Sequence, residues 1–125
     1  MGLSNKKEIL TDAGVDVDGV LQRFMNNEAL AERFLKKFPD DATFGKLEEA
    51  IDAGDYEEAF KEVHTLKGVA GNLGLTRLFA CASDMTEKLR RNETDTARDD
   101  FKEMKAVYNA LISAIGDSLG NGMER

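Results

Sequence analysis

The sequence predicts an all-α protein: an up-down-up-down four-helix bundle with one or two short N-terminal capping helices. Hydrophobic residues make up 42% of the 125 residues and charged residues 33%, a composition typical of a globular domain. The chain has one proline, no tryptophan and few clustered β-branched residues, which favours helices over strands. Apolar residues recur with helical spacing, and the four longest periodic segments begin near residues 40, 55, 75 and 96. Because the connections between these segments are short, consecutive helices must run antiparallel.

The first 40 residues are predicted to contain a loop and two short helices. Residues 10–19 are rich in Asp, Gly and Val, and we expect them to form a loop that leads into the first helix. Asn26 and Asn27 separate two apolar stripes, and Pro39 ends the second because the residue before a proline avoids helical geometry. The first stripe contains Val17, Val20, Leu21 and Phe24, and the second contains Leu30, Phe34, Leu35 and Phe38.

Local signals delimit the next two helices. An aspartate at position 40 or 41 can cap a helix that Gly54 closes as its C-terminal cap. Asp55 then opens the central helix, and Glu58 three residues later predicts a reciprocal capping arrangement. The inward positions of these two helices are Phe44, Leu47, Ala50 and Ile51, followed by Tyr56, Ala59, Phe60, Val63, Leu66, Ala70 and Leu73.

Two further helices complete the predicted bundle. Gly74 ends the central helix, and the polar residues 92–96 form a loop between the last two. The last helix is predicted to end at Gly116 or after Leu119. The inward positions here are Leu78, Phe79, Ala82, Met85 and Leu89, followed by Phe101, Met104, Tyr108, Leu111, Ile112 and Ile115.

Length and charge limit the organisation of the protein and its partners. We expect residues 1–125 to form a single domain, with about 17–119 as the helical core and frayed ends. The net charge of −7 has the wrong sign for binding nucleic acid or an anionic membrane surface. Cys81 is the only cysteine and is expected to be a small packed residue, since no intrachain disulfide is possible. Because the sequence shows no apolar leader or anchor, the expected location is the cytoplasm. The expected oligomeric state is a monomer.

The central helix contains the only histidine of the sequence, His64. At about 100° per residue, His64 lies just outside the apolar stripe around Val63 and faces solvent at a slant. Gly68 and Gly71 follow on the same face, although a glycine inside a helix costs on the order of 1 kcal/mol relative to alanine. That cost is explained if a bulky group must approach the imidazole closely.

The residues around His64 also have structural interpretations. Gly71 serves equally well to let a neighbouring helix pack closely, whereas Gly68 lies on the solvent side of His64, where access is the better explanation. Lys67 can reach the same surface patch, where its ammonium would neutralise the oxygens of a phosphorylated imidazole. Its alternative role is that of a lysine whose stem lies along the edge of the core.

A longer motif surrounds these residues, and it is the run His64-Thr65-Leu66-Lys67-Gly68-Val69-Ala70-Gly71-Asn72-Leu73-Gly74. This run resembles the signature of histidine-containing phosphotransfer (HPt) domains of two-component phosphorelays, His-x-Leu-Lys-Gly-x-x-x-x-Leu-Gly. Every fixed position is present, and a looser resemblance extends from about Val17 to Leu119. The family implies a four-helix bundle with an N-terminal helical cap, in agreement with the periodicity.

The resemblance also implies roles and partners. His64 would be phosphorylated on its exposed ring nitrogen, with Lys67 as the phosphate-proximal cation and Gly68 as the clearance position, next to Gly71. The expected partners are response-regulator receiver domains and a hybrid histidine kinase, and Mg²⁺ is expected on the receiver. The sequence shows neither a phosphate-binding glycine loop nor a set of metal ligands. We therefore expect a signalling phosphoprotein without a cofactor and without kinase activity of its own.

Two other functions are alternatives to phosphotransfer. The chain could be a non-catalytic helical-bundle interaction module in which the histidine is incidental. It could also be a hydrolase or lyase with His64 as general base, but that chemistry needs an orienting polar group and an enclosed pocket. The sequence shows neither of these features.

Overall fold

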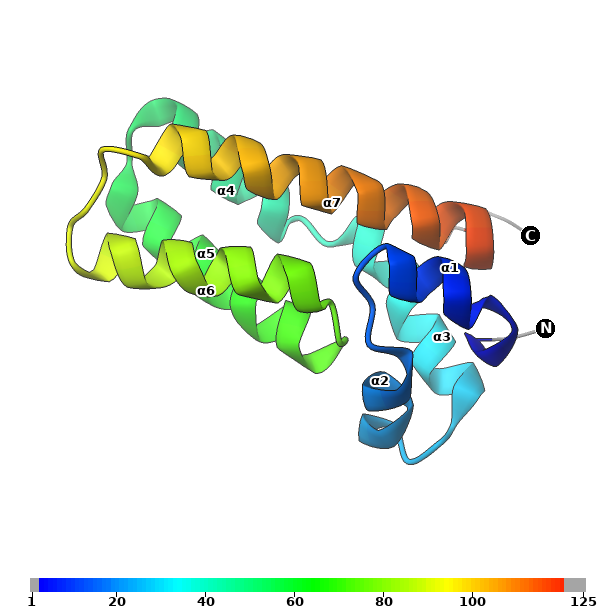
Figure 1. The fold of residues 1–125 in the computed structure, drawn as a ribbon. Helices are drawn as coiled ribbons and strands as arrows, with labels where there is room; N and C mark the ends of the chain where they lie inside the picture. Colours follow the sequence, from blue (N-terminus) through cyan, green and yellow to red (C-terminus); the bar gives the residue numbers. More distant parts are fainter. Residues whose placement is uncertain (1–2, 121–125) are drawn as a thin grey trace.

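The computed structural model describes residues 3–120, and within this range the regular elements are helices (Figure 1). The prediction of an all-α protein is therefore confirmed. The elements are, in chain order, η1 (Leu3–Lys6), α1 (Lys7–Asp12), α2 (Val17–Arg23), α3 (Glu28–Lys37), η2 (Phe38–Asp40), α4 (Thr43–Ala53), α5 (Tyr56–Asn72), α6 (Thr76–Arg90) and α7 (Ala97–Leu119).

The boundaries of the four long helices agree closely with the predicted ones. Gly54 ends α4 in the left-handed region at φ 70°, where its N–H donates to the carbonyls of Ala50 and Ile51. Gly74 follows α5 with φ 67° and starts the turn into α6. The last helix continues through Gly116 and ends at Leu119, the later of the two predicted positions.

The predicted capping of these helices is correct only in part. The Asp55 carboxylate accepts from the backbone N–H of Glu58 at 3.1 Å, as an N-cap should. The predicted reciprocal bond, from the Asp55 N–H to the Glu58 carboxylate, is not formed. The Asp55 N–H instead donates to the carbonyl of Ala50 at 2.9 Å, at the end of α4. Asp41 accepts from the N–H of Thr43 at 2.8 Å, although Ala42 occupies the cap position itself.

The N-terminal region is more helical than predicted. Residues 10–19 were expected to form a loop, but Leu10 belongs to α1 and Val17 begins α2, so the irregular part is shorter. The first helix has no side-chain cap, and its stability comes from packing, since Leu3 and Leu10 are fully buried. The predicted pair of short helices, α2 and α3, is thus preceded by η1 and α1. The fraying expected at the ends of the chain concerns residues 1–2 and 121–125, which lie outside the described residues.

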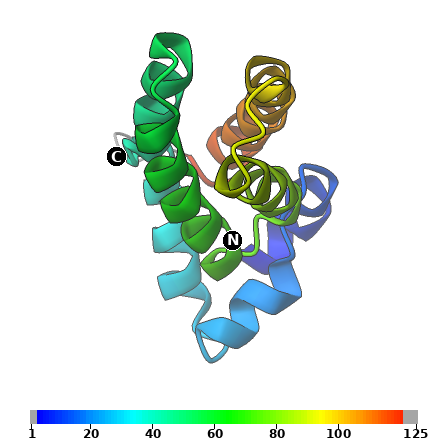
Figure 2. The same cartoon turned by 90° about the vertical axis from the view of Figure 1, so that its left-hand side faces the viewer.

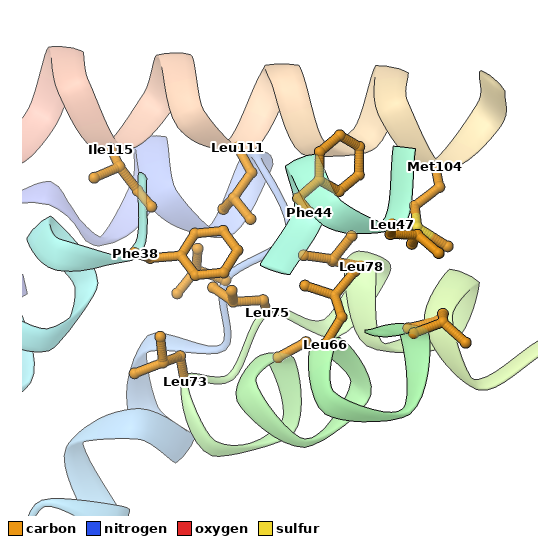
Figure 3. Packing of buried hydrophobic residues seen from close by; sticks show 14 of the residues in the cluster. Phe38, Phe44, Leu47, Leu66, Leu73, Leu75, Leu78, Met104, Leu111 and Ile115 are labelled. Carbon is orange, nitrogen blue, oxygen red and sulfur yellow. The ribbon is translucent and has the colours of Figure 1, made fainter. Parts of the chain in front are cut away.

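The four long helices lie side by side, with α1 to α3 at one end (Figure 1). Helix α5 packs against α4 and α6, and α7 contacts both α6 and α4. Viewed along these helices, α4 and α5 form one side and α6 and α7 the other (Figure 2). Leu47, Leu66, Leu78 and Met104 come one from each helix and meet in the buried interior between them (Figure 3).

Two aromatic residues predicted to face inward are instead exposed. Phe34 is 44% exposed and stacks on Phe24, with 5.3 Å between the ring centroids. Phe79 is 39% exposed and lies beside Gly71 on the outer surface of α5 and α6. Apolar character alone did not distinguish a core position from one at the edge of the core.

Candidate functional site

His64 lies in the middle of α5, on the outer face of the helix, and is exposed. The opposite face holds Val63, Leu66 and Ala70, which are fully buried. One turn before the histidine, the ring of Phe60 approaches the imidazole with 6.0 Å between centroids. The amphipathic pattern of the helix thus fixes the imidazole at the boundary between core and solvent.

His64 lines a shallow surface hollow of about 330 Å³. The hollow brings together the four residues singled out in the sequence, one further residue of α5, one residue from α2 and one from α6. Its lining consists of Arg23, His64, Lys67, Gly68, Gly71, Asn72 and Phe79. The geometry places the four predicted residues side by side, and their chemical roles remain predictions.

The two glycines of the hollow have different surroundings. A Cβ atom built at Gly68 would meet no atom within 4 Å, so the space beside His64 is open. A Cβ atom at Gly71 would lie 3.3 Å from Cε1 of Phe79, which is closer than ordinary contact. Gly71 therefore has a packing role towards α6, whereas nothing within the described residues requires a glycine at position 68.

Lys67 occupies a position at the edge of the core. Its side chain is half-buried, and its Nζ lies 6.0 Å from the centroid of the Phe79 ring. Both interpretations of this lysine are compatible with the geometry, because the stem can cover apolar surface while the ammonium stays beside the hollow. Lys67 therefore lines the same hollow as His64, and its role towards a phosphoryl group stays a prediction.

A further cation contacts Phe60, the aromatic residue one turn before His64. The guanidinium of Arg90 is 5.3 Å from the centroid of the Phe60 ring, and its Nε lies 3.5 Å from a carboxylate oxygen of Glu87. The hollow itself is lined by two cationic side chains, Lys67 and Arg23, although the whole chain carries a net charge of −7.

Sequence reasoning missed one residue of the hollow entirely, Arg23. It is the last residue of α2, far from His64 in the sequence. The two are brought together because the Asp16 N–H donates to the carbonyl of Gly74 at 2.7 Å, which attaches the start of α2 to the end of α5. No local pattern in the sequence marks this long-range contact.

Two properties of the described residues bear on other functions. Among residues 3–120, no group of three or more His, Cys, Asp or Glu side chains is placed to hold a metal ion. In the same range, every helix is too short or too polar to cross a membrane.

Comparison with known proteins identifies the family. The family model described as "Hpt domain" matches residues 29–114, which include α4 to α6, most of α7 and every residue that lines the hollow around His64 except Arg23. Neither a search of curated proteins nor one of solved structures gives a match. Since the family model covers more than half of the chain, the protein belongs to the Hpt domain family, the histidine phosphotransfer domains of two-component phosphorelays.

Proposed function

We propose that the protein is a phosphorelay intermediary. His64 accepts a phosphoryl group from an aspartate of one receiver domain and passes it to an aspartate of another. The observation that carries the proposal is the exposed imidazole of the only histidine in the chain, in an open hollow with a cation beside it. A four-helix up-down-up-down arrangement of α4 to α7 is the scaffold that we propose for it.

The chemistry requires only nucleophilic substitution at phosphorus. The lone pair of an unprotonated imidazole nitrogen attacks the phosphorus of the receiver's acyl phosphate, an N–P bond forms, and the aspartate leaves as a carboxylate. In the second transfer a carboxylate of the next receiver attacks phosphorus, and the N–P electron pair returns to the imidazole. Lys67 is proposed to stabilise the negative charge of the phosphoryl oxygens in both steps.

The proposal assigns the remaining machinery to the partners. Mg²⁺ belongs to the receiver domain, and a hybrid histidine kinase is the proposed source of the phosphoryl group. The protein is proposed to act as a cytoplasmic monomer and as a phosphocarrier without kinase activity. Gly68 is proposed to leave room for the receiver's active-site loops, which fits the open space at its Cα.

The test uses a ³²P-labelled receiver domain and the His64→Gln variant. The wild-type protein should acquire label that is lost in acid and retained in alkali, whereas His64→Gln should acquire none and keep its thermal unfolding midpoint. Asn109→Gln, at an exposed position on α7, is the control and should be labelled normally. Equal labelling of the wild type and His64→Gln would contradict the proposal. If the wild type acquires no label, and both proteins bind the partner equally well, the interaction module is favoured.

A further inference from the structure

We infer that Arg23 is a second phosphoryl-binding residue of this site, and that its guanidinium binds oxygens of the phosphoryl group on His64 together with Lys67. The inference rests on the proposed function of His64 and adds to it a residue from outside the family motif. Helix α2 would thus contribute a phosphoryl-binding side chain to the site around His64 on α5.

Arg23 is available to an anion at this place. Its side chain is exposed, and it lines the hollow of His64 as well as the two larger hollows on either side. Within residues 3–120 it makes no ion pair or hydrogen bond through its side chain. Other arginines of the chain bind oxygen atoms: Arg77 the carbonyl of Asp12, Arg91 the carboxylate of Glu93, and Arg98 the carbonyl of Asp52.

The backbone holds α2 firmly enough to place this side chain. The Asp16 N–H donates to the Gly74 carbonyl at 2.7 Å, and the Asp16 carboxylate caps α2 by accepting from the Gly19 N–H at 3.0 Å. A Cβ atom at Gly74 would lie 3.0 Å from the carbonyl oxygen of Asp16, so the glycine permits this close approach. Arg23, the last residue of α2, thereby lines the same hollow as His64.

The charge of the ligand explains the need for a second cation. A phosphoryl group carries about −1.5 to −2 charges near neutral pH and offers three acceptor oxygens. One ammonium neutralises only part of this charge. The net charge of −7 on the chain repels the phosphoryl group, so a second cation would offset that repulsion. A guanidinium supplies parallel N–H donors that suit two phosphoryl oxygens at once. The absence of a side chain at Gly68 leaves the space between these groups free.

The test measures the phosphoryl group directly and uses no receiver. Phosphoramidate, a small phosphoryl donor, is used to label His64, and ³¹P NMR then follows the protonation of the phosphorylated imidazole between pH 5 and 8. A neighbouring cation disfavours the added proton, so Arg23→Gln should move the midpoint to higher pH by about half a pH unit. The initial rate of labelling should fall by about threefold, because the donor is an anion.

Two further variants separate binding from general charge effects. Arg23→Lys keeps the charge and should recover most of the wild-type midpoint. Arg98→Gln removes the same charge near the start of α7, at the opposite end of the molecule from α2, and should leave the midpoint in place (Figure 1). Circular dichroism should show equal helix content in all variants.

The inference is overturned if Arg23→Gln has the wild-type midpoint, or if Arg98→Gln moves the midpoint as far. Failure of the wild-type protein to be labelled by phosphoramidate would also overturn it, because an open imidazole beside two cations must accept this donor. Failure of the proposed function has a different signature: labelling by phosphoramidate with an Arg23 effect, but no transfer from any phosphorylated receiver.

Discussion

Two regions of the molecule differ in the side chains that they contain. One is the contact between α4 and α7, and the other is the outer face of α5. Between α4 and α7, the ring of Phe44 stacks on Tyr108 at 3.8 Å between centroids and on Phe101 at 5.1 Å, while Phe38 meets the edge of Tyr108. The outer face of α5 has two glycines, an exposed imidazole and a shallow hollow. We therefore expect substitutions in the first region to lower stability and substitutions in the second to affect the proposed phosphotransfer.

The largest effect is expected in the aromatic region. Phe44 is 5% exposed, so Phe44→Ala should lower the free energy of unfolding by about 3 to 5 kcal/mol through lost burial and a cavity. Urea unfolding measures this loss. Phe34→Ala, at an exposed aromatic position, is the matched control and should cost less than half as much. A protein that stays folded should still accept label on His64, and equal losses for the two variants would remove the distinction between the regions.

The opposite result is expected at Gly68. Gly68→Ala should raise the free energy of unfolding by up to about 1 kcal/mol, because alanine favours the helix and the new methyl group meets no neighbour. Transfer from a phosphorylated receiver should slow by about tenfold, since the methyl group would collide with the partner at a cost of about 1 to 3 kcal/mol. Rapid quenching of the transfer reaction measures the rate. An unchanged rate would show that Gly68 is not a clearance position.

Gly71→Ala provides the comparison within the same face. Its methyl group would press on Phe79 at 3.3 Å, which should cancel much of the gain in helix propensity. The net change in stability should be smaller than that of Gly68→Ala. Adding Phe79→Ala to Gly71→Ala should recover the propensity gain in a double-mutant cycle. If Gly71→Ala alone stabilises as much as Gly68→Ala, the packing role of Gly71 is wrong.

The smallest effect concerns alkaline pH and again belongs to the aromatic region. Burial raises the pKa of the Tyr108 hydroxyl, and the negative charge of Asp41 raises it further. The unfolded chain then loses this proton at a lower pH than the folded protein. The contribution to stability is thus complete below about pH 10 and is lost as the pH rises towards the folded-state pKa. Tyr108→Phe should show a weaker loss of stability between pH 9 and 11.5 in urea titrations, and an identical loss would contradict the assignment.

Cys81 lies on α6 and is a packed residue, as the sequence predicts. It is partly buried and packs against the core. Burial is the main reason that the pKa of its thiol is raised, and the carboxylates of Glu103, Asp84 and Asp100 add to the effect. The thiol therefore stays protonated at neutral pH.

Features set by neighbouring residues were predictable from the sequence. Gly54, Asp55 and Gly74 act within a few residues of their own positions, so they marked the helix boundaries correctly. His64, Lys67 and Gly68 lie on one helix, and helical periodicity alone places them on one surface. This is why most of the hollow could be anticipated.

Features set by distant contacts were not predictable. Helix α1 has no cap and depends on the burial of Leu10 against other helices, which the composition of residues 10–19 conceals. Phe79 is apolar and at a helical spacing that favours the core, yet it lies outside beside Gly71. Arg23 lines the hollow of His64 because the backbone contact at Gly74 joins α2 to the end of α5.

The contacts between residues 14–16 and residues 74–76 also bear on the order of folding. Thr76 donates to the carbonyl of Gly14 across 62 residues of sequence, whereas α5 and α6 are joined by the short turn at residues 73–75. The entropy lost on closing a flexible loop grows with its length, by about 0.6 kcal/mol for each doubling. We therefore expect the hairpin of α5 and α6 to form early and α2 to attach late. The cationic surface beside His64 would then be complete only when the N-terminal helices have closed this long loop.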